Sequence, residues 1–368
     1  MSKLLGVINL DKEHDFLNEL TYFRCGAAVP FAGRYRLIDF TMVNMVHSGI
    51  TELGIFTKRK YRSLLDHLHV GKQWNLDRKK GGLFILPPDW HDPSDISVGE
   101  LRHFANNMDF FERSLADYVL HCGSQNICKV NYKDVLKQHI DTGADVTLIY
   151  NPVDKLESEH SECKRLDIKS NGEVQNIHNE VDNKNIYMDM FIINKDLLIE
   201  LIQHCIAHRK DNFFKGGIMD NINDLKIYSY RYDGYHAVIN SIESYYKNNM
   251  RLLNMEDYIS LFMQGKPVPT KVKDEVPTRY LENADVSNSL VANGCIIDGV
   301  VENSMIFRGV KVEKGAYIKD SIVMSRAVIE EDVSLENVIL DKKVSVSKGQ
   351  HLSGVEEKPF VLAKRKSV

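Results

Sequence analysis

The chain has 368 residues, of which 43% are hydrophobic and 27% are charged, and its formal net charge is −4. This length predicts about two domains, and the composition supplies a packed core, which excludes a disordered protein. The small acidic excess argues against nucleic-acid binding, and no apolar stretch reaches the ~20 residues that span a membrane.

The six cysteines are scattered along the chain, and none belongs to a C-x-x-C pair. The N-terminal residues lack the apolar segment and cleavage site of a signal peptide. We therefore expect reduced thiols in a cytoplasmic protein.

Residues 1–262 alternate between strand-like and helix-like segments, which predicts an α/β domain. This alternation favours a doubly wound, Rossmann-like fold with a mainly parallel sheet covered by helices. The expected strands include 4–10, 52–57, 117–122, 144–150 and 185–193, and the expected helices include 38–50, 61–69, 101–114, 131–143, 195–209 and 241–254.

The residue pattern changes after residue 262. Residues 263–283 contain three prolines and mixed charge, which predicts an extended linker. Beyond the linker, small or β-branched residues recur every six positions, and such a hexad predicts a left-handed parallel β-helix over 284–368. The positions in phase are Gly294, Val300, Ile306, Val312 and Ile318, then Val310, Ala316, Ile322 and Val328, and then Ala327, Val333 and Ile339. An antiparallel sandwich is the alternative, but it would show period-2 alternation instead.

Several sequence words carry a resemblance to a known family. They are VPFAGRYRLIDF at 29–40, N-x-x-x-SGI at 44–50, DYVLHC at 117–122 and IESYYKNNMRLL at 242–253. With the order of the predicted domains, these words resemble bacterial glucose-1-phosphate adenylyltransferase over essentially the whole chain. The resemblance implies transfer of an adenylyl group from ATP to glucose 1-phosphate, with pyrophosphate leaving. It also implies a glycine-rich loop for the triphosphate and two aspartates for Mg²⁺.

The chain departs from the family at each of these catalytic parts. The loop positions after the first strand contain Asp11, Glu13 and Asp15 and no glycine. Two like charges 4 Å apart repel by ~4 kcal/mol at an effective dielectric of ~20, so this segment should not bind ATP in the family's way. The family's lysine aligns with Gly26, and its two metal-binding aspartates align with Gln125 and Val238. We therefore predict no catalytic residue, no metal site and no cofactor for this chain.

This pattern of losses resembles the GlgD-type subunits of the family. The resemblance implies a regulatory, catalytically impaired subunit of glycogen biosynthesis that joins a catalytic GlgC-type chain in a heterotetramer. Mg²⁺ and ATP would then bind to the catalytic partner, and a homo-oligomer is the alternative for the chain alone.

Basic residues remain where the family binds sugar-phosphate effectors between its domains. Arg24, Arg34, Arg36, Lys364 and Arg365 are the candidate anion-binding residues. Guanidinium groups suit phosphate, but solvated surface cations or salt-bridge partners explain the same residues equally well.

Two conserved-looking polar residues of the same words are interpreted as structural. Asp39 is expected to act as a carboxylate at a helix N-terminus and Asn44 as a buried amide.

Two other functional classes stay open at this point. An active nucleotidyltransferase with a rearranged site could take its metal ligands from Asp109, Asp189 or Asp220. A β-helix acyltransferase is disfavoured because residues 284–350 contain no histidine.

Overall fold

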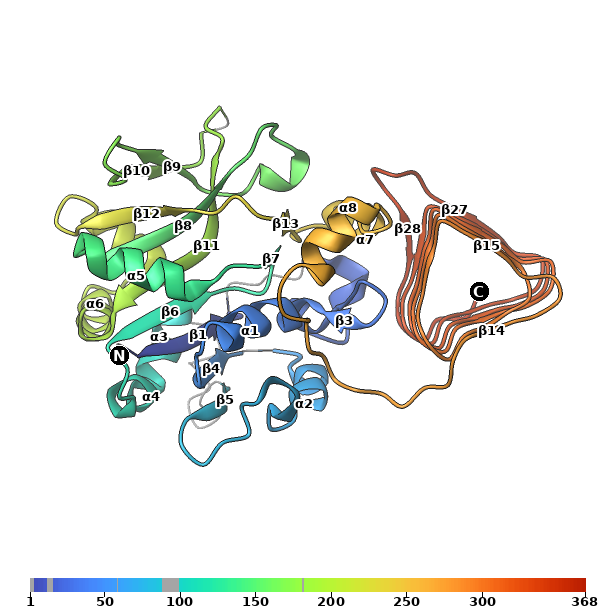
Figure 1. The fold of residues 1–368 in the computed structure, drawn as a ribbon, viewed down its shortest axis with the longest axis horizontal. Helices are drawn as coiled ribbons and strands as arrows, with labels where there is room; N and C mark the ends of the chain where they lie inside the picture. The colour runs from blue at the N-terminus through green and yellow to red at the C-terminus, as the bar shows by residue number, and fades with distance from the viewer. Residues whose placement is uncertain (1–2, 12–15, 58, 88–98, 181) are drawn as a thin grey trace. The chain divides into compact units, whose positions relative to one another are not determined.

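The computed structural model describes residues 3–11, 16–57, 59–87, 99–180 and 182–368 (Figure 1). Its contacts divide the chain into two compact units, each described by itself below. The first comprises Met1–His14, Phe40–Tyr61 and Leu68–His236, and the second comprises Asp15–Asp39, Arg62–His67 and Ala237–Val368. These units cut across the predicted ranges, so the boundaries at residues 262 and 283 stay a prediction.

The first unit is built on a sheet with the strand order β10-β9-β11-β6-β1-β4-β5, in which β8 also pairs with β11 and β12 with β8. Strands β6, β1, β4 and β5 are parallel, but β11 is antiparallel to both β6 and β8. The α/β class is therefore confirmed, with a mixed sheet. The strands are β1 (Leu4–Asn9), β4 (Glu52–Phe56), β5 (Gly82–Leu86), β6 (Tyr118–Cys122), β7 (Asn126–Cys128), β8 (Val146–Pro152), β9 (Arg165–Ile168), β10 (Val174–His178), β11 (Asn185–Asn194) and β12 (Ile227–Arg231).

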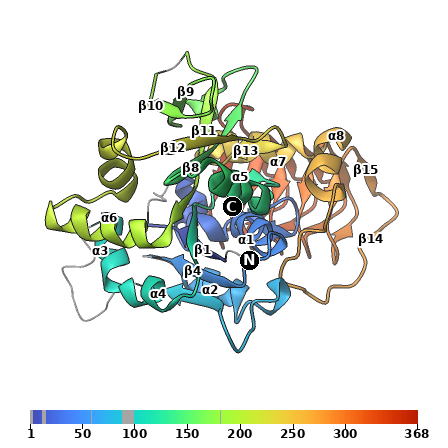
Figure 2. The same ribbon diagram turned by 60° about the vertical axis from the view of Figure 1, so that its left-hand side comes forward.

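Helices cover both faces of this sheet, with α3, α4 and α6 on one face and α5 on the other (Figure 2). The core under α3 and α4 is aromatic, and the rings of Phe56 and Phe104 lie 4.9 Å apart in an edge-to-face pair. The helices are α3 (Gly99–Asn106), α4 (Met108–Arg113), α5 (Tyr132–Thr142) and α6 (Lys195–Ala207), with short helical turns at η3 (Lys72–Trp74), η5 (Ser158–His160), η6 (Phe214–Ile218) and η7 (Met219–Asn221).

Local chemistry determines where these helices begin and end. The side chain of Asn131 accepts a hydrogen bond from the Lys133 amide at the start of α5, and Gly143 ends the helix with φ = +59°. The single helix predicted over 101–114 is wrong, because Asn107 separates α3 from α4. Asn107 leaves helical geometry (ψ = +29°), and its side chain donates to the His103 carbonyl, which competes with the backbone ladder.

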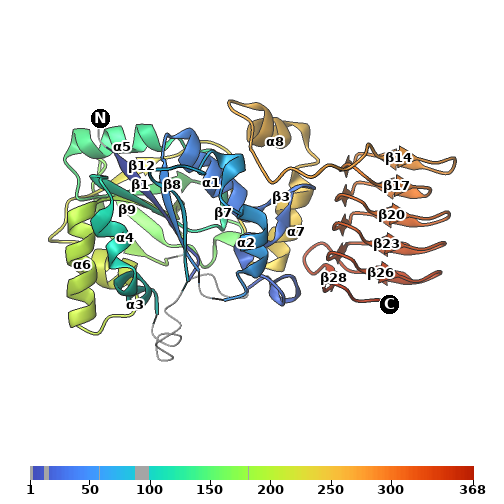
Figure 3. The same ribbon diagram turned by 90° about the horizontal axis from the view of Figure 1, so that it is seen from below.

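The second unit contains a β-helix made of three parallel sheets of five strands each (Figure 3). This stacking confirms the predicted β-helix and is consistent with the left-handed form. The first sheet has β14 (Arg279–Tyr280), β17 (Ile296–Ile297), β20 (Lys311–Val312), β23 (Val328–Ile329) and β26 (Ser345–Val346). The second has β15 (Asp285–Ser287), β18 (Val300–Glu302), β21 (Tyr317–Lys319), β24 (Ser334–Glu336) and β27 (His351–Ser353). The third has β16 (Leu290–Val291), β19 (Met305–Ile306), β22 (Ile322–Val323), β25 (Val338–Leu340) and β28 (Phe360–Leu362).

Shorter elements complete the second unit. They are η1 (Asn18–Thr21), η2 (Gly26–Ala28), β2 (Pro30–Phe31), β3 (Tyr35–Arg36), α7 (Ile242–Arg251), α8 (Met255–Tyr258) and η8 (Ile259–Met263). Three more elements contain residues of both units, namely α1 (Leu37–His47), α2 (Arg62–Leu68) and β13 (His236–Val238). No helix in the described ranges is long and apolar enough to cross a bilayer.

The inward ladder of the β-helix differs in phase from the predicted hexad. Ile297, Val312, Ile329 and Val346 are register partners and are at most 1% exposed. Most coils therefore span 17 residues and one spans 15, so a strict period of six drifts out of phase. Consequently Val328, predicted to point inward, is only half-buried, whereas its neighbour Ile329 is buried.

This register predicts a contrast between two adjacent substitutions. Ile329→Ala should lower the free energy of unfolding by about 2–5 kcal/mol, because it opens a cavity in the β-helix core. Val328→Ala should lower it by about 1 kcal/mol or less, because its side chain already contacts solvent. Chemical denaturation of both variants measures the difference, and equal effects would contradict the register.

Candidate functional site

The end of β1 is closed by two buried polar pairs in the first unit. The Asn9 side-chain amide donates to one Glu100 oxygen at 2.6 Å, and the other Glu100 oxygen accepts the Phe213 amide at 2.6 Å. The Asp11 carboxylate lies 2.6 Å from Nδ1 of His103, whose Nε2 lies 2.9 Å from the Leu86 carbonyl. Both His103 nitrogens therefore face oxygen atoms, and these contacts fix the position of the ring.

This closed end occupies the place where the resemblance puts a phosphate loop. Asn9, Glu100 and His103 are each at most 4% exposed. Among the described residues, one Asp11 oxygen is buried without a hydrogen-bond partner, so the acid is turned into the fold. The predicted acids Glu13 and Asp15 lie outside the described residues.

The three positions predicted to have lost their catalytic groups lie in ordinary structural surroundings. Gly26 is buried in η2, Gln125 is half-buried just before β7, and Val238 is 4% exposed in β13. A valine offers no ligand atom, and a glutamine offers only one neutral oxygen, whereas Mg²⁺ prefers carboxylates. The residues present therefore do not fit the family's metal ion.

The alternative metal ligands are engaged elsewhere. Asp109 pairs with Arg113 at 3.4 Å, and Asp220 pairs with Lys210 at 2.7 Å. Asp189 lies in β11 with a positive φ of +52°. The described part of the chain holds no group of three or more His, Cys, Asp or Glu side chains that could bind a metal.

Arg24, the first candidate anion-binding residue, is buried in an ion pair within the second unit. Its guanidinium contacts the Asp341 carboxylate, and the side chains are 3% and 0% exposed. The second guanidinium nitrogen is buried without a hydrogen-bond partner in the described structure. Arg24 therefore has a structural role as an ion-pair partner, and one of its guanidinium nitrogens has no acceptor among the described residues.

The other predicted cations have different environments. Arg36 donates to the Ser63 carbonyl at 2.5 Å, and burial lowers its pKa to about 10 despite the opposing Asp39 charge. Arg34 is exposed, with its guanidinium 5.5 Å from the Tyr35 ring centre. Burial and then the Arg24 charge lower the pKa of Lys364, and Arg365 is exposed.

The structure brings Arg34 and Arg36 into one pocket of about 230 Å³ in the second unit, which we call the basic pocket. Its other basic side chains were missed from the sequence, and they come from the residues before β14 and from two coils of the β-helix. They are Lys271, Lys273, Arg308 and Lys342. Arg308, Ser325 and Lys342 occupy the same position in successive coils, 17 residues apart, and this spacing was the available signal.

The charges in the basic pocket repel one another. Burial, followed by Arg36, Arg24 and Lys273, lowers the pKa of Lys342 well below the ordinary lysine range. Burial and neighbouring arginines also lower the pKa values of Lys273 and Arg308. Within the described ranges, none of these three side chains makes a hydrogen bond or ion pair. Such an arrangement favours an added anion.

A buried carboxylate holds the walls of the basic pocket. Asp39 accepts the Arg36 amide at 3.0 Å, the Thr270 hydroxyl at 2.6 Å and Nε2 of His67 at 2.6 Å. Burial lowers the pKa of His67, and Asp39 partly opposes this. Asp39 is thus structural, as is Asn44, whose amide donates to the Cys128 carbonyl at 2.9 Å.

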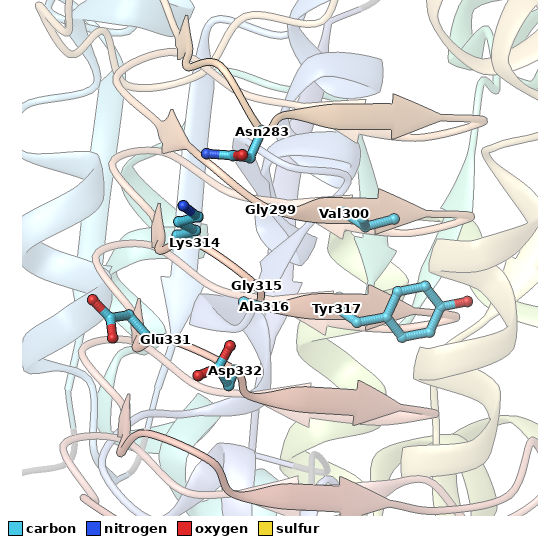
Figure 4. A pocket seen from close by; sticks show the side chains of 9 residues that line it. All are labelled: Asn283, Gly299, Val300, Lys314, Gly315, Ala316, Tyr317, Glu331 and Asp332. Atoms are coloured by element: carbon cyan, nitrogen blue, oxygen red, sulfur yellow. The ribbon is translucent and has the colours of Figure 1, made fainter.

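A polar groove of about 460 Å³ lies on the β-helix alone (Figure 4). Its polar lining consists of Asn283, Lys314, Glu331 and Asp332. Gly299 also lines it, and a side chain at this position would clash with the Ala316 carbonyl. Lys348 pairs with Glu331 at 2.5 Å and lies 3.9 Å from Asp332, and these contacts between neighbouring coils indicate a structural feature.

Comparison with known proteins matches both halves of this architecture. The nucleotidyl transferase family matches residues 17–177, and the family described as GlmU-like, C-terminal hexapeptide matches residues 269–358. The glycogen biosynthesis protein GlgD of Bacillus subtilis (strain 168) is 38% identical over 99% of this chain and 96% of its own length. The chain belongs to the GlgD family of glycogen biosynthesis proteins.

Other relatives agree with this assignment. GlgD of Geobacillus stearothermophilus is also 38% identical, over 99% of this chain and 96% of its own length. The glucose-1-phosphate adenylyltransferase of Clostridium perfringens (strain SM101 / Type A) is 32% identical over 85% of this chain and 82% of its own length. The GlgD family is thus related to the adenylyltransferases, as the sequence words predicted.

The ion pair of Arg24 predicts a large effect on stability. Arg24→Ala should lower the free energy of unfolding by about 3–5 kcal/mol, because it leaves Asp341 charged, buried and unpaired. Arg34→Ala is the matched control and should change it by about 0.5 kcal/mol or less, because Arg34 is exposed. Urea denaturation provides the measurement, and similar losses for both variants would exclude a special role for the pair.

The lowered pKa of Lys342 predicts a pH-dependent effect. Between its folded pKa and the ordinary lysine value, the unfolded chain binds more protons than the folded chain, so stability rises with pH. Lys342→Met removes this proton linkage and should raise the melting temperature more at pH 7 than at pH 10. Thermal melts at both values measure this, with Lys311→Met, an exposed lysine in β20, as the control. A gain in melting temperature that is larger at pH 10 than at pH 7 would contradict a lowered pKa of Lys342 in the folded chain.

Proposed function

We propose that this chain is a regulatory, catalytically impaired subunit of glucose-1-phosphate adenylyltransferase in bacterial glycogen biosynthesis. The observation that carries the proposal is a contrast between two regions. The closed end of β1 pairs Asp11 with His103 where the family needs phosphate-binding amides. In the basic pocket, by contrast, the side chains of Lys273, Arg308 and Lys342 make no hydrogen bond or ion pair with the described residues. Membership in the GlgD family supports the same reading.

The basic pocket is the proposed effector site, and a sugar phosphate is the proposed class of effector. Its volume of about 230 Å³ suits a phosphate group and part of a sugar ring. Arg36 offers a guanidinium fork, and Lys273 and Lys342 offer ammonium groups whose mutual repulsion an anion would relieve.

The proposed partner is the catalytic GlgC-type chain, which would supply Mg²⁺ and ATP in a heterotetramer. The outermost strands at one end of the β-helix, β14, β15 and β16, pair on one side only in their sheets. Such strand edges support association with another chain. All six cysteines are free, which supports a cytoplasmic location.

Reconstitution with the catalytic subunit tests the regulatory proposal. The isolated chain should form negligible ADP-glucose, and adding it to the catalytic subunit should change turnover or the response to sugar phosphates. Co-purification of the two chains, followed by assays with and without this chain, supplies the measurement. Robust Mg²⁺-dependent activity of the isolated chain would overturn the proposal and favour a rearranged active site.

The effector site predicts a second, separable result. A Lys273→Gln/Lys342→Gln variant should raise the half-saturating concentration of a sugar-phosphate effector of the assembled enzyme by about tenfold or more, because two charge-assisted contacts are lost. Lys311→Gln is the matched control outside the pocket, and co-purification should be normal for both variants. An unchanged effector response of the double variant would exclude this pocket as the effector site.

A further inference from the structure

A large groove of the first unit lies at the opposite end of β1 from Asp11. It has a volume of about 1120 Å³ and extends from the start of β1 to the exposed side of α5. β1 separates the two ends by on the order of 20 Å, since a strand rises ~3.3 Å per residue. The groove therefore cannot belong to the closed end of β1.

The floor of this groove is apolar. Ile50 and Ala116 form its buried part, and Leu136 and Ile140 line it from α5. Leu115 is 81% exposed and Ile140 is 43% exposed, so large aliphatic side chains face solvent there. Exposed apolar side chains that gather in one concave surface are typical of a binding site.

The rim of the same groove is basic. Lys3, Lys80, Lys133 and Lys137 line it, and none of them makes a side-chain hydrogen bond or ion pair with the residues that the structure describes. The one acid in the lining, Glu52, is already engaged by the Ser114 hydroxyl at 2.7 Å.

Two of the rim lysines come from the same helix. Lys133 and Lys137 are four residues apart on α5, a spacing at which like charges repel. An apolar floor below uncompensated lysines suits a ligand with an apolar body and an anionic head. A purely inorganic anion would leave the floor exposed, and a neutral apolar molecule would leave the lysines unpaired.

We propose that this groove binds a monomeric anionic amphiphile, with an alkyl chain on the Leu115–Ile140 floor and a carboxylate, sulfate or phosphate head among the lysines. The groove then forms a second ligand site, independent of the proposed regulatory function and of the basic pocket. Its position at the start of the parallel strands is distinct from the closed end of β1.

A homologous series of alkyl sulfates tests the proposal on the full chain. Hexyl, octyl and decyl sulfate are titrated calorimetrically below their micellar concentrations. Affinity should rise by about fourfold for each methylene that is buried, and octanol should bind more weakly than octyl sulfate. Affinity independent of chain length, or no difference between octanol and octyl sulfate, would overturn the proposal.

Variants locate the binding in this groove. Lys133→Gln/Lys137→Gln should weaken octyl sulfate binding by about tenfold and reduce its salt dependence. Leu115→Ser should weaken it several-fold without unfolding the chain, because Leu115 is already 81% exposed. Lys155→Gln/Lys226→Gln, which changes two exposed lysines of the same unit outside the groove, is the matched control.

Two further outcomes would reassign the groove. Loss of self-association or of partner binding in Leu115→Ser, with alkyl sulfate binding unchanged, would identify a protein contact and overturn the proposal. Flotation with phosphatidylglycerol vesicles that the lysine variant abolishes, without binding of monomeric octyl sulfate, would identify a membrane surface and also overturn it.

Discussion

The basic pocket of the second unit depends on the hydrogen bonds that the Asp39 carboxylate accepts. It is fully buried and joins three segments that are far apart in sequence, through the Arg36 amide, His67 and the Thr270 hydroxyl. A buried carboxylate is tolerated only when its hydrogen bonds are satisfied, so these segments are held together as a condition of folding. Their ordering places Arg36 beside Lys273 and the β-helix cations. The hydrogen bonds of Asp39 thus hold the cations of the pocket close together although their charges repel one another.

In the described part of the first unit, the buried polar side chains at the end of β1 leave no row of donors for a phosphate ligand. At the end of β1, Asn9 pairs with Glu100 and Asp11 with His103, so the polar side chains there bond mainly to one another. A phosphate site needs the reverse, namely donors left without partners until the ligand arrives. Unpaired donors remain in this protein at other places, in the basic pocket and along the lysine rim at the start of the parallel strands. Among the described residues, cationic donors without partners therefore lie away from the end of β1.

The sequence predicted the elements well wherever periodicity and caps agreed. The α5 helix runs from Tyr132 to Thr142 between an Asn131 cap and Gly143, as the pattern required. Prediction was wrong where a single side chain decided the outcome. Asn107 divides α3 from α4 through its bond to the His103 carbonyl, and periodicity carries no signal of that competition. The hexad likewise identified the β-helix but not its phase, because the coils around Val328 span 15 and 17 residues rather than a multiple of six.

By itself, the sequence determined the α/β class, the β-helix and the family, and it predicted which of the family's catalytic positions have lost their groups. These follow from local patterns and from the identity of single residues such as Gln125 and Val238. Only the tertiary structure decided which cations act together. Arg24 and Arg36 looked equivalent as sequence, yet Arg24 is neutralised by Asp341, 317 positions later, while Arg36 joins Lys342 in a pocket. The physical reason is that charge and burial depend on partners brought together by folding, and residue spacing along the chain does not encode those distances.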